Sequence, residues 1–411
     1  MTLHRRARTL LGGLLAGVLV ASCAAPDPTP RTVDAQSWSS VLAQARGQTV
    51  SLWMYSGDTQ GNAYVDRVLT PAVAAQGVTL RRVPVANTSD ALARVLAERQ
   101  AGVSSGSVDL VWVNGANFAT GQQVGAWLCG WAGGLPDAAL TDPADPLLRS
   151  DFGVPVDGCE APWHEAQFTL VYDAAKVPAP PATLAGVLDW ARAHPGRFTY
   201  PAPPDFTGSV FVRQVLTSVT GGGDAVPRAF DQAAYDRDAP ALLDTLRALA
   251  PSLWRGGTTY PQTGEELDQL YADGQVDLTM TYGPATLTDL VAKGTYPATT
   301  KVLPLEEGTF GNASFLALPA SSGARAGAMV VANTALSPEQ QAAKADPATW
   351  GQFPVLDPAR LTPAQRAPFD AVPASPVVPT HAELSRHAQP ELAPGWVTAL
   401  DAGWRSQVLG G

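Results

Sequence analysis

Short apolar runs with the composition of buried strands alternate with amphipathic helical segments over most of this chain. Residues 50–55 form one such run, and a helix is expected to follow from about Asn62. Thr88 and Ser89 can cap the next helix, and residues 263–266 have the pattern of a capping box. This alternation is typical of α/β layers, and 411 residues are enough for two or three domains.

Two segments far apart in the chain resemble each other. Residues 106–115 (GSVDLVWVNG) and 274–283 (GQVDLTMTYG) each follow a helix, run as a short buried strand and end at a glycine where a new helix can start. In open α/β sheets, ligands bind beyond the carboxyl ends of such strands. The pair therefore predicts two lobes with a cleft between them, and chance similarity of two strand patterns is the alternative.

The charge balance excludes one class of partner. Lys and Arg number 27 against 37 acidic residues, which gives a net charge of −10. Nucleic-acid binding requires clustered Lys and Arg to neutralise phosphates, and this chain has no basic stripe. We therefore expect no nucleic-acid partner.

The N-terminus has the pattern of an export signal. Three arginines at positions 5, 6 and 8 precede an uncharged apolar run over 10–21 that is too short to span a bilayer comfortably. Residues 19–23 (LVASC) resemble a bacterial lipobox, in which Cys23 would carry a diacylglycerol. We therefore predict a lipoprotein signal peptide at 1–22 and a lipid-anchored tether at 23–40, which places the protein outside the cytoplasm on the cell membrane. An ordinary secretory signal is the alternative, and the export route, Sec or twin-arginine, stays open.

Two further cysteines follow, Cys129 and Cys159. Outside the cytoplasm, an isolated pair of cysteines is most simply a disulfide. The alternative is two buried thiols, since a CxxC metal or redox motif is absent from the sequence.

Motifs for catalysis are weak. Residues 102–106 match the hydrolase pattern G-x-S-x-G, but a helix precedes Ser104 and a strand follows, which inverts the required order. His164-Glu165 lacks the second histidine of a zinc protease helix. We therefore predict that the protein is not an enzyme, with no catalytic residue, no metal and no cofactor. An extracytoplasmic hydrolase is the competing class.

Polar and aromatic residues gather at the predicted strand ends and helix starts. The Thr-Gly-Ser sequence at 207–209 would open a helix with free backbone N–H groups, which suits an anionic or carbonyl group, or it is a plain N-cap. For each aromatic residue, core packing is the alternative to ligand contact. The predicted ligand-binding residues are Tyr55, Ser56, Gly57, Asp58, Asn114, Asn117, Phe118, Trp163, Thr207, Gly208, Ser209 and Tyr282.

An ordered set of segments gives the strongest indication of family. They are residues 109–118, 161–163 with Gln167 and 172–173, 198–201, 205–209, 307–309, and 331–333 running through 336–339 to 344–347 and Trp350. Together they resemble the YnjB-like family of ABC-transporter solute-binding lipoproteins. The segment between Cys129 and Cys159 departs from that pattern.

The resemblance implies an α/β, two-lobed, type II periplasmic-binding-protein fold, with the ligand cleft between lobes that two crossover segments join. Lobe 1 would comprise residues 41–170 and 304–411, and lobe 2 residues 171–303. The chain would cross near 168–172 and recross near 302–309. The tail, including 359–379, would wrap lobe 1 as a C-terminal helical segment.

The resemblance also implies a function: extracytoplasmic capture of a small-molecule solute by hinge closure, as a monomer that works with an ABC permease and ATPase. The segments expected at the cleft carry Asp58, Glu165 and Asp205 but no Lys or Arg, although Arg213 lies one turn into its helix. A multiply charged anion would normally be met by Arg, whereas acidic and aromatic residues suit a cation. We therefore favour an organic cation, thiamine-like or polyamine-like, over the alternative of an oxyanion or another small polar solute.

Overall fold

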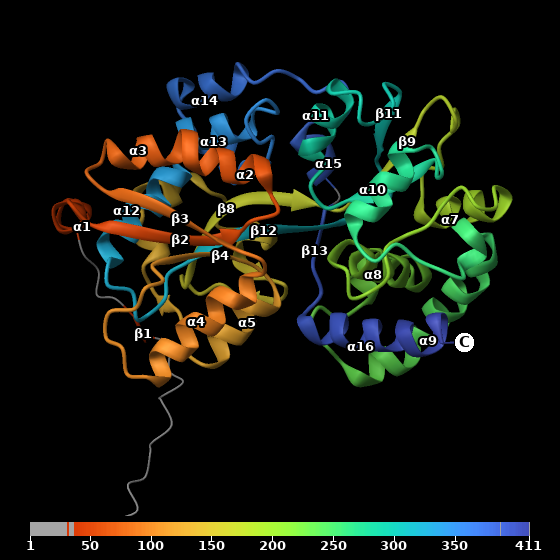
Figure 1. Cartoon of the computed structure of the whole chain (residues 1–411), viewed down its shortest axis with the longest axis horizontal. Helices are drawn as coiled ribbons and strands as arrows, with labels where there is room; N and C mark the ends of the chain where they lie inside the picture. The colour runs from red at the N-terminus through yellow and green to blue at the C-terminus, as the bar shows by residue number, and fades with distance from the viewer. Residues whose placement is uncertain (1–30, 33–36, 387, 411) are drawn as a thin grey trace, which may run out of the picture.

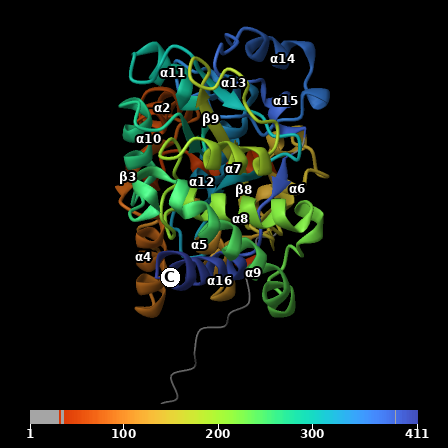
Figure 2. The same cartoon turned by 90° about the vertical axis from the view of Figure 1, so that its right-hand side faces the viewer.

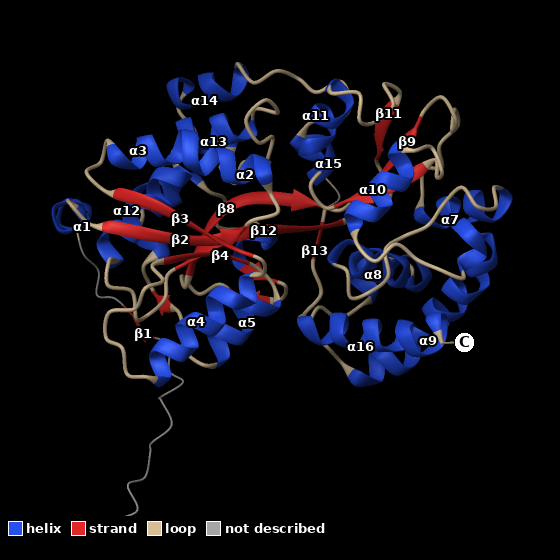
Figure 3. Cartoon of the chain, viewed as in Figure 1, coloured by secondary structure: helices blue, strands red, loops and turns tan. Residues whose placement is uncertain are grey.

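Two β-sheets organise the fold, and each forms the centre of one lobe (Figures 1 and 3). The computed structural model describes residues 31–32, 37–386 and 388–410, so the predicted signal peptide and Cys23 lie outside the described residues. The first sheet has the order β13-β12-β4-β2-β3, and β8 also pairs with β12. Its strands are β2 (Thr49–Tyr55), β3 (Thr79–Val85), β4 (Leu110–Val113), β8 (Glu160–Gln167), β12 (Phe310–Ala317) and β13 (Gln389–Pro390). The second sheet has the order β10-β9-β11, with β9 (Thr169–Asp173), β10 (Leu278–Thr281) and β11 (Thr300–Leu303).

Helices cover both faces of the first sheet, and these elements form the first lobe (Figure 3). On one face, α4 (Thr88–Gln100) and α5 (Ala116–Gln123) pack over Val111 and Phe315. On the other face, α1 (Trp38–Ala45), α3 (Thr70–Ala74) and α12 (Arg325–Leu336) pack over Leu52 and Leu110. The remaining helices of this lobe are α2 (Thr59–Tyr64), α6 (Pro146–Arg149), α13 (Pro338–Ala345) and α14 (Pro363–Asp370).

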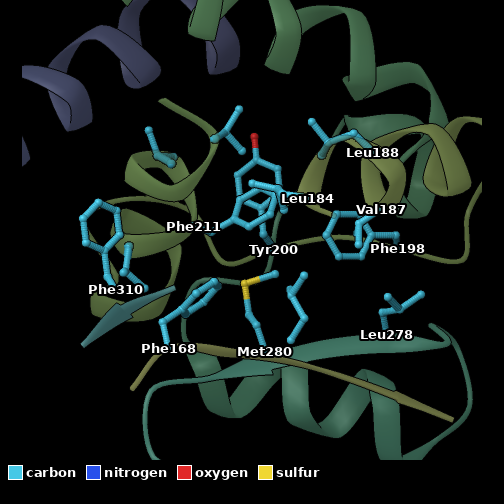
Figure 4. Close-up of a cluster of buried hydrophobic side chains, with 14 of the residues drawn as sticks. Phe168, Leu184, Val187, Leu188, Phe198, Tyr200, Phe211, Leu278, Met280 and Phe310 are labelled. Carbon is cyan, nitrogen blue, oxygen red and sulfur yellow. The ribbon is translucent and has the colours of Figure 1, made fainter. Parts of the chain in front are cut away.

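The second lobe surrounds the three-stranded sheet with a core of its own. Its helices are α7 (Leu184–Ala193), α8 (Phe206–Thr220), α9 (Gln232–Leu249), α10 (Gly264–Ala272), α11 (Leu287–Ala292) and α16 (Pro394–Trp404). Figure 4 shows Phe168 and Met280 from the strand side beneath Tyr200 and Phe211 from the helix side. Most of α8 is buried, so this helix is the central element of the lobe.

The two similar strands lie in different lobes, as the sequence predicts. Strand β4 belongs to the first sheet and β10 to the second. Each is followed by a helical segment: α5 follows β4, and the 3-10 turn η7 (Pro284–Thr286) and α11 follow β10. The local repeat therefore marks equivalent positions in the two lobes.

Three segments connect the lobes. The chain passes from β8 to β9 at Phe168 and returns between β11 and β12, close to the two expected crossings. A third segment, residues 371–393, carries α15 (His381–Ser385) and β13 and leads to α16. The Gln167 amide Nε2 donates to Thr309 Oγ1 at 2.9 Å and to the Leu384 carbonyl at 3.0 Å, so one side chain touches all three. We call these three segments the hinge.

The tail corrects the expectation that residues 304–411 return to the first lobe. Helix α14 packs on α13 in that lobe, but α16 packs on α8 and α9 of the second lobe (Figure 2). The reason is the apolar face of α16, whose Trp396, Leu400 and Trp404 are buried in the second core. The second lobe is therefore completed by residues more than 90 positions beyond its predicted boundary at 303.

Helix caps differ in one place from expectation. Asn87, rather than Thr88 or Ser89, caps α4: its backbone is extended, and it forms a capping box with Asp90, so Thr88 is already helical. Helix α10 begins as predicted after Thr263, whose side chain accepts the N–H of Glu266.

Short elements complete the description. Strand β1 (Arg31–Thr32) pairs with β5 (Leu128–Cys129), and β6 (Ser150–Asp151) forms a hairpin with β7 (Val154–Pro155). The short helices are η1 (Val65–Leu69) and η9 (Arg405–Leu409), of π type, and the 3-10 turns η2 (Ala132–Gly134), η3 (Pro136–Leu140), η4 (Gly223–Ala225), η5 (Ala250–Ser252), η6 (Trp254–Gly257) and η8 (Pro358–Arg360).

Candidate functional site

A cavity of about 230 Å³ lies between the two lobes. The first lobe contributes Asn114, Gly115, Ala116, Asn117 and Phe152, and the second lobe contributes Pro204, Phe206, Ser209, Arg213, Pro394, Val397 and Thr398. The cavity therefore brings together three predicted site residues, Asn114, Asn117 and Ser209. We call it the interlobe cavity.

The first-lobe wall begins where β4 ends. Asn114 follows the last residue of the strand and donates from Nδ2 to Ser314 Oγ at 3.3 Å. Gly115 has a φ of +60°, which favours glycine, and its N–H donates to both carboxylate oxygens of Asp151 at 2.7 and 2.8 Å. The backbone turn at Gly115 starts α5 and places Asn117 on the cavity.

The second-lobe wall begins at the N-terminus of α8. Here the structure agrees with the alternative interpretation of residues 207–209 as the start of an ordinary capped helix, with Asp205 as the N-cap. Asp205 Oδ1 accepts the N–H of Gly208 at 2.9 Å, and its backbone carbonyl accepts the N–H of Ser209 at 2.8 Å. The Ser209 hydroxyl donates to Asp401 at 2.7 Å. These N–H groups are therefore engaged within the protein, and Thr207 and Gly208 do not line the cavity.

A buried ion pair lies one helical turn beyond Ser209 on α8, and its arginine lines the cavity. Arg213 binds the carboxylate of Glu391 through Nε and Nη2, both at 2.9 Å. The Tyr282 hydroxyl donates to the same carboxylate at 3.1 Å. Tyr282, a predicted site residue, is thus held behind the cavity lining by Glu391 from the third hinge segment.

Aromatic rings from both lobes meet at the cavity. Phe206, whose side chain is 45% exposed, lies 5.0 Å from Tyr282 and 6.3 Å from Phe152, measured between ring centroids. Phe152 belongs to the first lobe and Phe206 to the second, so this contact crosses the gap between the lobes.

Carboxyl groups outnumber cations around the cavity. Asp151 is 1% exposed, and its pKa is raised to about 7, first by burial and further by the charge of Glu391. Burial also raises the pKa of Asp401, against the opposing effects of Ser209 and Arg213. Glu160 next to Asp151 is buried with neither carboxyl oxygen hydrogen-bonded among the described residues, and burial raises its pKa well above the usual value. Burial therefore favours the uncharged form of these carboxyl groups, and a positive charge in the cavity would favour their ionised form.

The predicted residues at 55–58 lie away from the cavity. Tyr55 is 41% exposed at the end of β2, with its ring against Gly57. The Ser56 N–H donates to the Val85 carbonyl. Asp58 caps α2, since Oδ1 accepts the N–H of Gly61 at 2.8 Å, and its Oδ2 accepts Trp350 Nε1 at 2.9 Å. Burial raises the pKa of Asp58.

Trp163 and Phe118 are core residues, which is the alternative that the sequence left open. Trp163 is buried among Trp112, His164 and Trp350, with ring centroids 5.2 to 5.6 Å from its own. Phe118 lies on α5 and is buried in the core between this helix and the sheet. Packing inside the first lobe therefore accounts for both residues.

Among the described residues, the structure gives no support for a hydrolase nucleophile at Ser104, for a metal site or for a membrane-spanning helix. Ser104 is exposed in a turn after α4 and before β4, so the order required for a hydrolase nucleophile is inverted. Across the described ranges, no three His, Cys, Asp or Glu side chains are arranged to hold a metal ion. Every helix within those ranges falls short of a membrane span in length or apolar character.

Four residues at or behind the candidate cavity were not among those predicted: Phe152, Phe206 and Thr398 line it, and Glu391 lies behind Arg213. Phe206 is adjacent to the predicted Thr207, and the sequence marks it only as an apolar residue at the start of a helix. Glu391 and Thr398 were missed because the tail was assigned to the first lobe. Phe152 lies in the segment between the two cysteines, which the resemblance did not cover.

Comparisons with known proteins agree with this architecture. Residues 69–372 match the family described as "Bacterial extracellular solute-binding protein". The chain is 39% identical over 371 residues to Protein YnjB of Escherichia coli (strain K12), an alignment that covers 90% of this chain and 93% of the relative.

Solved structures with low sequence identity share the fold. A periplasmic thiamin binding protein superimposes with a TM-score of 0.55 at 17% identity, covering 88% of this chain and 96% of the other. A spermidine/putrescine ABC transporter substrate-binding protein from Streptococcus pneumoniae superimposes with a TM-score of 0.60 at 11% identity, covering 88% and 99%. Solute-binding proteins of ABC transporters bind small solutes outside the cytoplasm and work with permease and ATPase components. From its sequence match, its fold and its interlobe cavity, this chain belongs to the bacterial extracellular solute-binding protein family.

Proposed function

We propose that this protein captures a small organic cation in the interlobe cavity and delivers it to an ABC permease. The observation that carries the proposal is the set of carboxyl groups buried directly behind the lining: Asp151 contacts Gly115, Asp401 contacts Ser209, and Glu391 is paired with Arg213. A cationic solute would reduce the repulsion among these groups, whereas an anion would increase it.

Arg213 does not offset all of these carboxyl groups. Its guanidinium is bound by two hydrogen bonds to Glu391, so the charge of that pair is already balanced. Arg228 interacts with Glu391 and Arg405 with Asp401, and, like those two carboxyl groups, neither arginine lines the cavity. Asp151 and Asp401 lie behind Gly115 and Ser209, from where their carboxyl groups would favour a positive charge in the cavity.

The aromatic residues suit the same class of ligand. A cation against a ring face gains roughly 0.5–2 kcal/mol, and Phe152 and Phe206 supply one ring from each lobe. Thiamin, spermidine and putrescine, named for two solved proteins with this fold, are organic cations, and this supports the choice of class.

The competing oxyanion has weaker support. Its expected receptor was the start of α8, where Asp205 and the helix itself already accept the N–H groups of Gly208 and Ser209. An anion would have to displace the half-buried Asp205 or separate Arg213 from Glu391, and the second step leaves the buried Glu391 carboxylate without its partner.

Capture would occur by closure of the lobes about the hinge. The cavity has walls from both lobes, so a bound solute bridges them and favours the closed arrangement. The hinge is ordered by Gln167, and the backbone N–H of Gln389 adds a hydrogen bond to the Thr309 carbonyl at 2.9 Å. The closed form would present the surface that the permease recognises.

We also propose that Cys23 anchors the protein to the outer face of the cell membrane. The support is the lipobox sequence at 19–23, which lies outside the described residues. The predicted tether at 23–40 is shortened by the fold, because Arg31–Thr32 pair with β5 and α1 begins at Trp38. The residues that precede β1 would let the lobes reach the permease while the lipid remains in the membrane.

Titration of intrinsic fluorescence with thiamine, spermidine, sulfate and a panel of sugars tests the ligand class. We expect saturable binding of at least one of the two cations, because the Tyr282 ring packs against Phe206 at the cavity. Tight binding of sulfate or a sugar with no response to either cation would overturn the proposal.

A pair of variants sharpens this test. Asp401→Asn removes one carboxylate but keeps an acceptor for Ser209, and we expect about tenfold weaker binding of the cation. Glu306→Gln removes an exposed carboxylate outside the cavity lining and should leave the affinity unchanged. Equal affinities of the two variants would contradict an electrostatic role for the cavity carboxyls.

A further inference from the structure

The segment between the two cysteines packs into the cores of the first lobe through Trp131, Leu135 and Val156. Cys129 and Cys159 are joined in a disulfide that closes 30 positions of sequence. Near its base, the Trp131 indole N–H donates to the Cys159 carbonyl at 3.3 Å, and the Leu128 N–H donates to the Leu318 carbonyl at 2.8 Å. The base of this segment is therefore fixed to the core, and its far end is the hairpin β6–β7.

That hairpin is fastened to the cavity wall by one residue. Asp151 places both carboxyl oxygens within 2.8 Å of the Gly115 nitrogen, and Gly115 is where β4 ends at the interlobe cavity. Two acceptors on one N–H fix both the position and the direction of the hairpin tip. Asp151 is thus a positioning residue for Phe152, which follows it in the sequence.

Phe152, the residue that follows, is held in an unfavourable backbone conformation. Its φ is +46°, a region that bulky residues rarely adopt because of backbone strain. The ring lies over Gly115, 3.4 to 3.5 Å from where a Cβ atom on that glycine would stand. The surrounding contacts therefore maintain a strained residue whose ring lines the cavity and approaches Phe206 of the other lobe.

We propose that the disulfide-closed hairpin is the ligand-selecting wall of the interlobe cavity, in which Phe152 supplies the ring that contacts the solute's cationic group. This inference rests on the proposed capture of an organic cation. Phe206 closes on the same solute from the second lobe, so the distance between the two rings limits the width of the ligand. The hydrogen bonds from the Gly115 N–H to Asp151 hold the Phe152 ring in place, and the disulfide fixes the base of the segment that carries the hairpin.

Titrations of four proteins with thiamine, spermidine and tetramethylammonium test this role. Phe152→Leu keeps apolar bulk but removes the ring, and we expect at least tenfold weaker binding of the tightest cation and a changed ratio of affinities for thiamine and spermidine. Phe152→Tyr keeps the ring and should restore affinity to within about threefold of the parent. Val154→Ala changes the same hairpin without touching the cavity lining and is the matched control.

Unchanged affinities and an unchanged ratio in Phe152→Leu would overturn the proposal. If the parent saturates with sulfate or a sugar instead of a cation, the proposed ligand class fails, and the same variants titrated with that compound still decide whether the hairpin selects the ligand. Asp151 is tested by amide hydrogen exchange: Asp151→Ala should lose protection at Gly115 and weaken ligand binding, whereas Asp151→Asn, which keeps an acceptor, should retain the protection at Gly115. Full protection and full affinity in Asp151→Ala would contradict its positioning role.

Discussion

Arg213 and Glu391 form a two-point ion pair between residues 178 positions apart, with both side chains only 1% exposed. Arg213 lies on α8, the central helix of the second lobe, and Glu391 lies on the third hinge segment. The Tyr282 hydroxyl adds a hydrogen bond to the same carboxylate. The pair therefore ties the tail of the chain to the wall of the candidate binding site.

Breaking this pair should be costly. Glu391→Gln leaves the buried Arg213 charge uncompensated, and we expect the free energy of unfolding in urea to fall by about 3–5 kcal/mol. The double variant Arg213→Met with Glu391→Leu should recover most of that loss, because no buried charge remains. Asp189→Asn, which breaks an exposed pair with Arg192, should change stability by about 0–1 kcal/mol. A similar small change for Glu391→Gln would contradict the assignment of a buried pair.

The disulfide should contribute to stability through the loop it closes. Cys129→Ser and Cys159→Ser are each expected to lower the free energy of unfolding by about 3–4 kcal/mol. In the parent protein, unfolded without reductant, neither cysteine should react with an alkylating reagent until the disulfide is reduced. Mass spectrometry that finds both cysteines alkylated without reduction would contradict the pairing.

Asp151 should make stability depend on pH. Burial raises its pKa from 3.8 to about 7 in the folded protein, so the folded state binds this proton more tightly than the unfolded state. Its contribution to stability is then complete below about pH 4 and is lost as the pH rises through about 7. The stability of Asp151→Asn minus that of the parent should therefore increase from pH 4 to pH 7 and level off above. Asp157→Asn, an exposed carboxyl in the same segment, is the control, and parallel pH curves for Asp151→Asn and the parent would refute the assignment.

The lipid anchor can be tested in cells. Cys23→Ser should yield a precursor that takes up no radiolabelled palmitate, because the proposed attachment atom, the Cys23 sulfur, is absent from this variant. The parent protein should be labelled and recovered with the membrane fraction. Equal labelling of the two proteins would show that the lipobox assignment is wrong.

Ligand binding should make the molecule more compact. Because the cavity has walls from both lobes, a saturating ligand is expected to reduce the radius of gyration measured by small-angle X-ray scattering. Because Asp401→Asn should bind the cation more weakly, this variant should need more ligand for the same reduction in radius. A radius that stays constant at saturation would contradict hinge closure.

The fold was largely predictable because its signals are local. The two similar segments each place a short buried strand between a helix and a glycine, and a pattern of ten residues was enough to assign β4 and β10 to separate lobes. The tail was not predictable in this way. Its place depends on contacts such as Ser209 with Asp401, 192 positions apart, for which a local pattern contains no information.

The site was predicted only in part for a similar reason. Asn114 and Asn117 follow a strand end, and the topology of the sheet brings that position to the cavity. Trp163 and Phe118 occupy comparable positions in sequence, but neighbouring side chains bury them completely. Residue type and proximity to a strand end do not reveal which side of a packed layer a ring will face.

Helix α16 has a consequence for how the protein is made. The second lobe buries residues from Phe168 to Trp404 in one core, so this lobe cannot finish folding until α16 has been synthesised and has reached α8 and α9. A chain cut short before α16 would expose the apolar surface that Trp396, Leu400 and Trp404 normally cover, and it would also lack Pro394, Val397 and Thr398 from the cavity. Such a product would be a substrate for quality-control proteases. The helix thus makes completion of the second core and completion of the cavity lining depend on the same eleven residues.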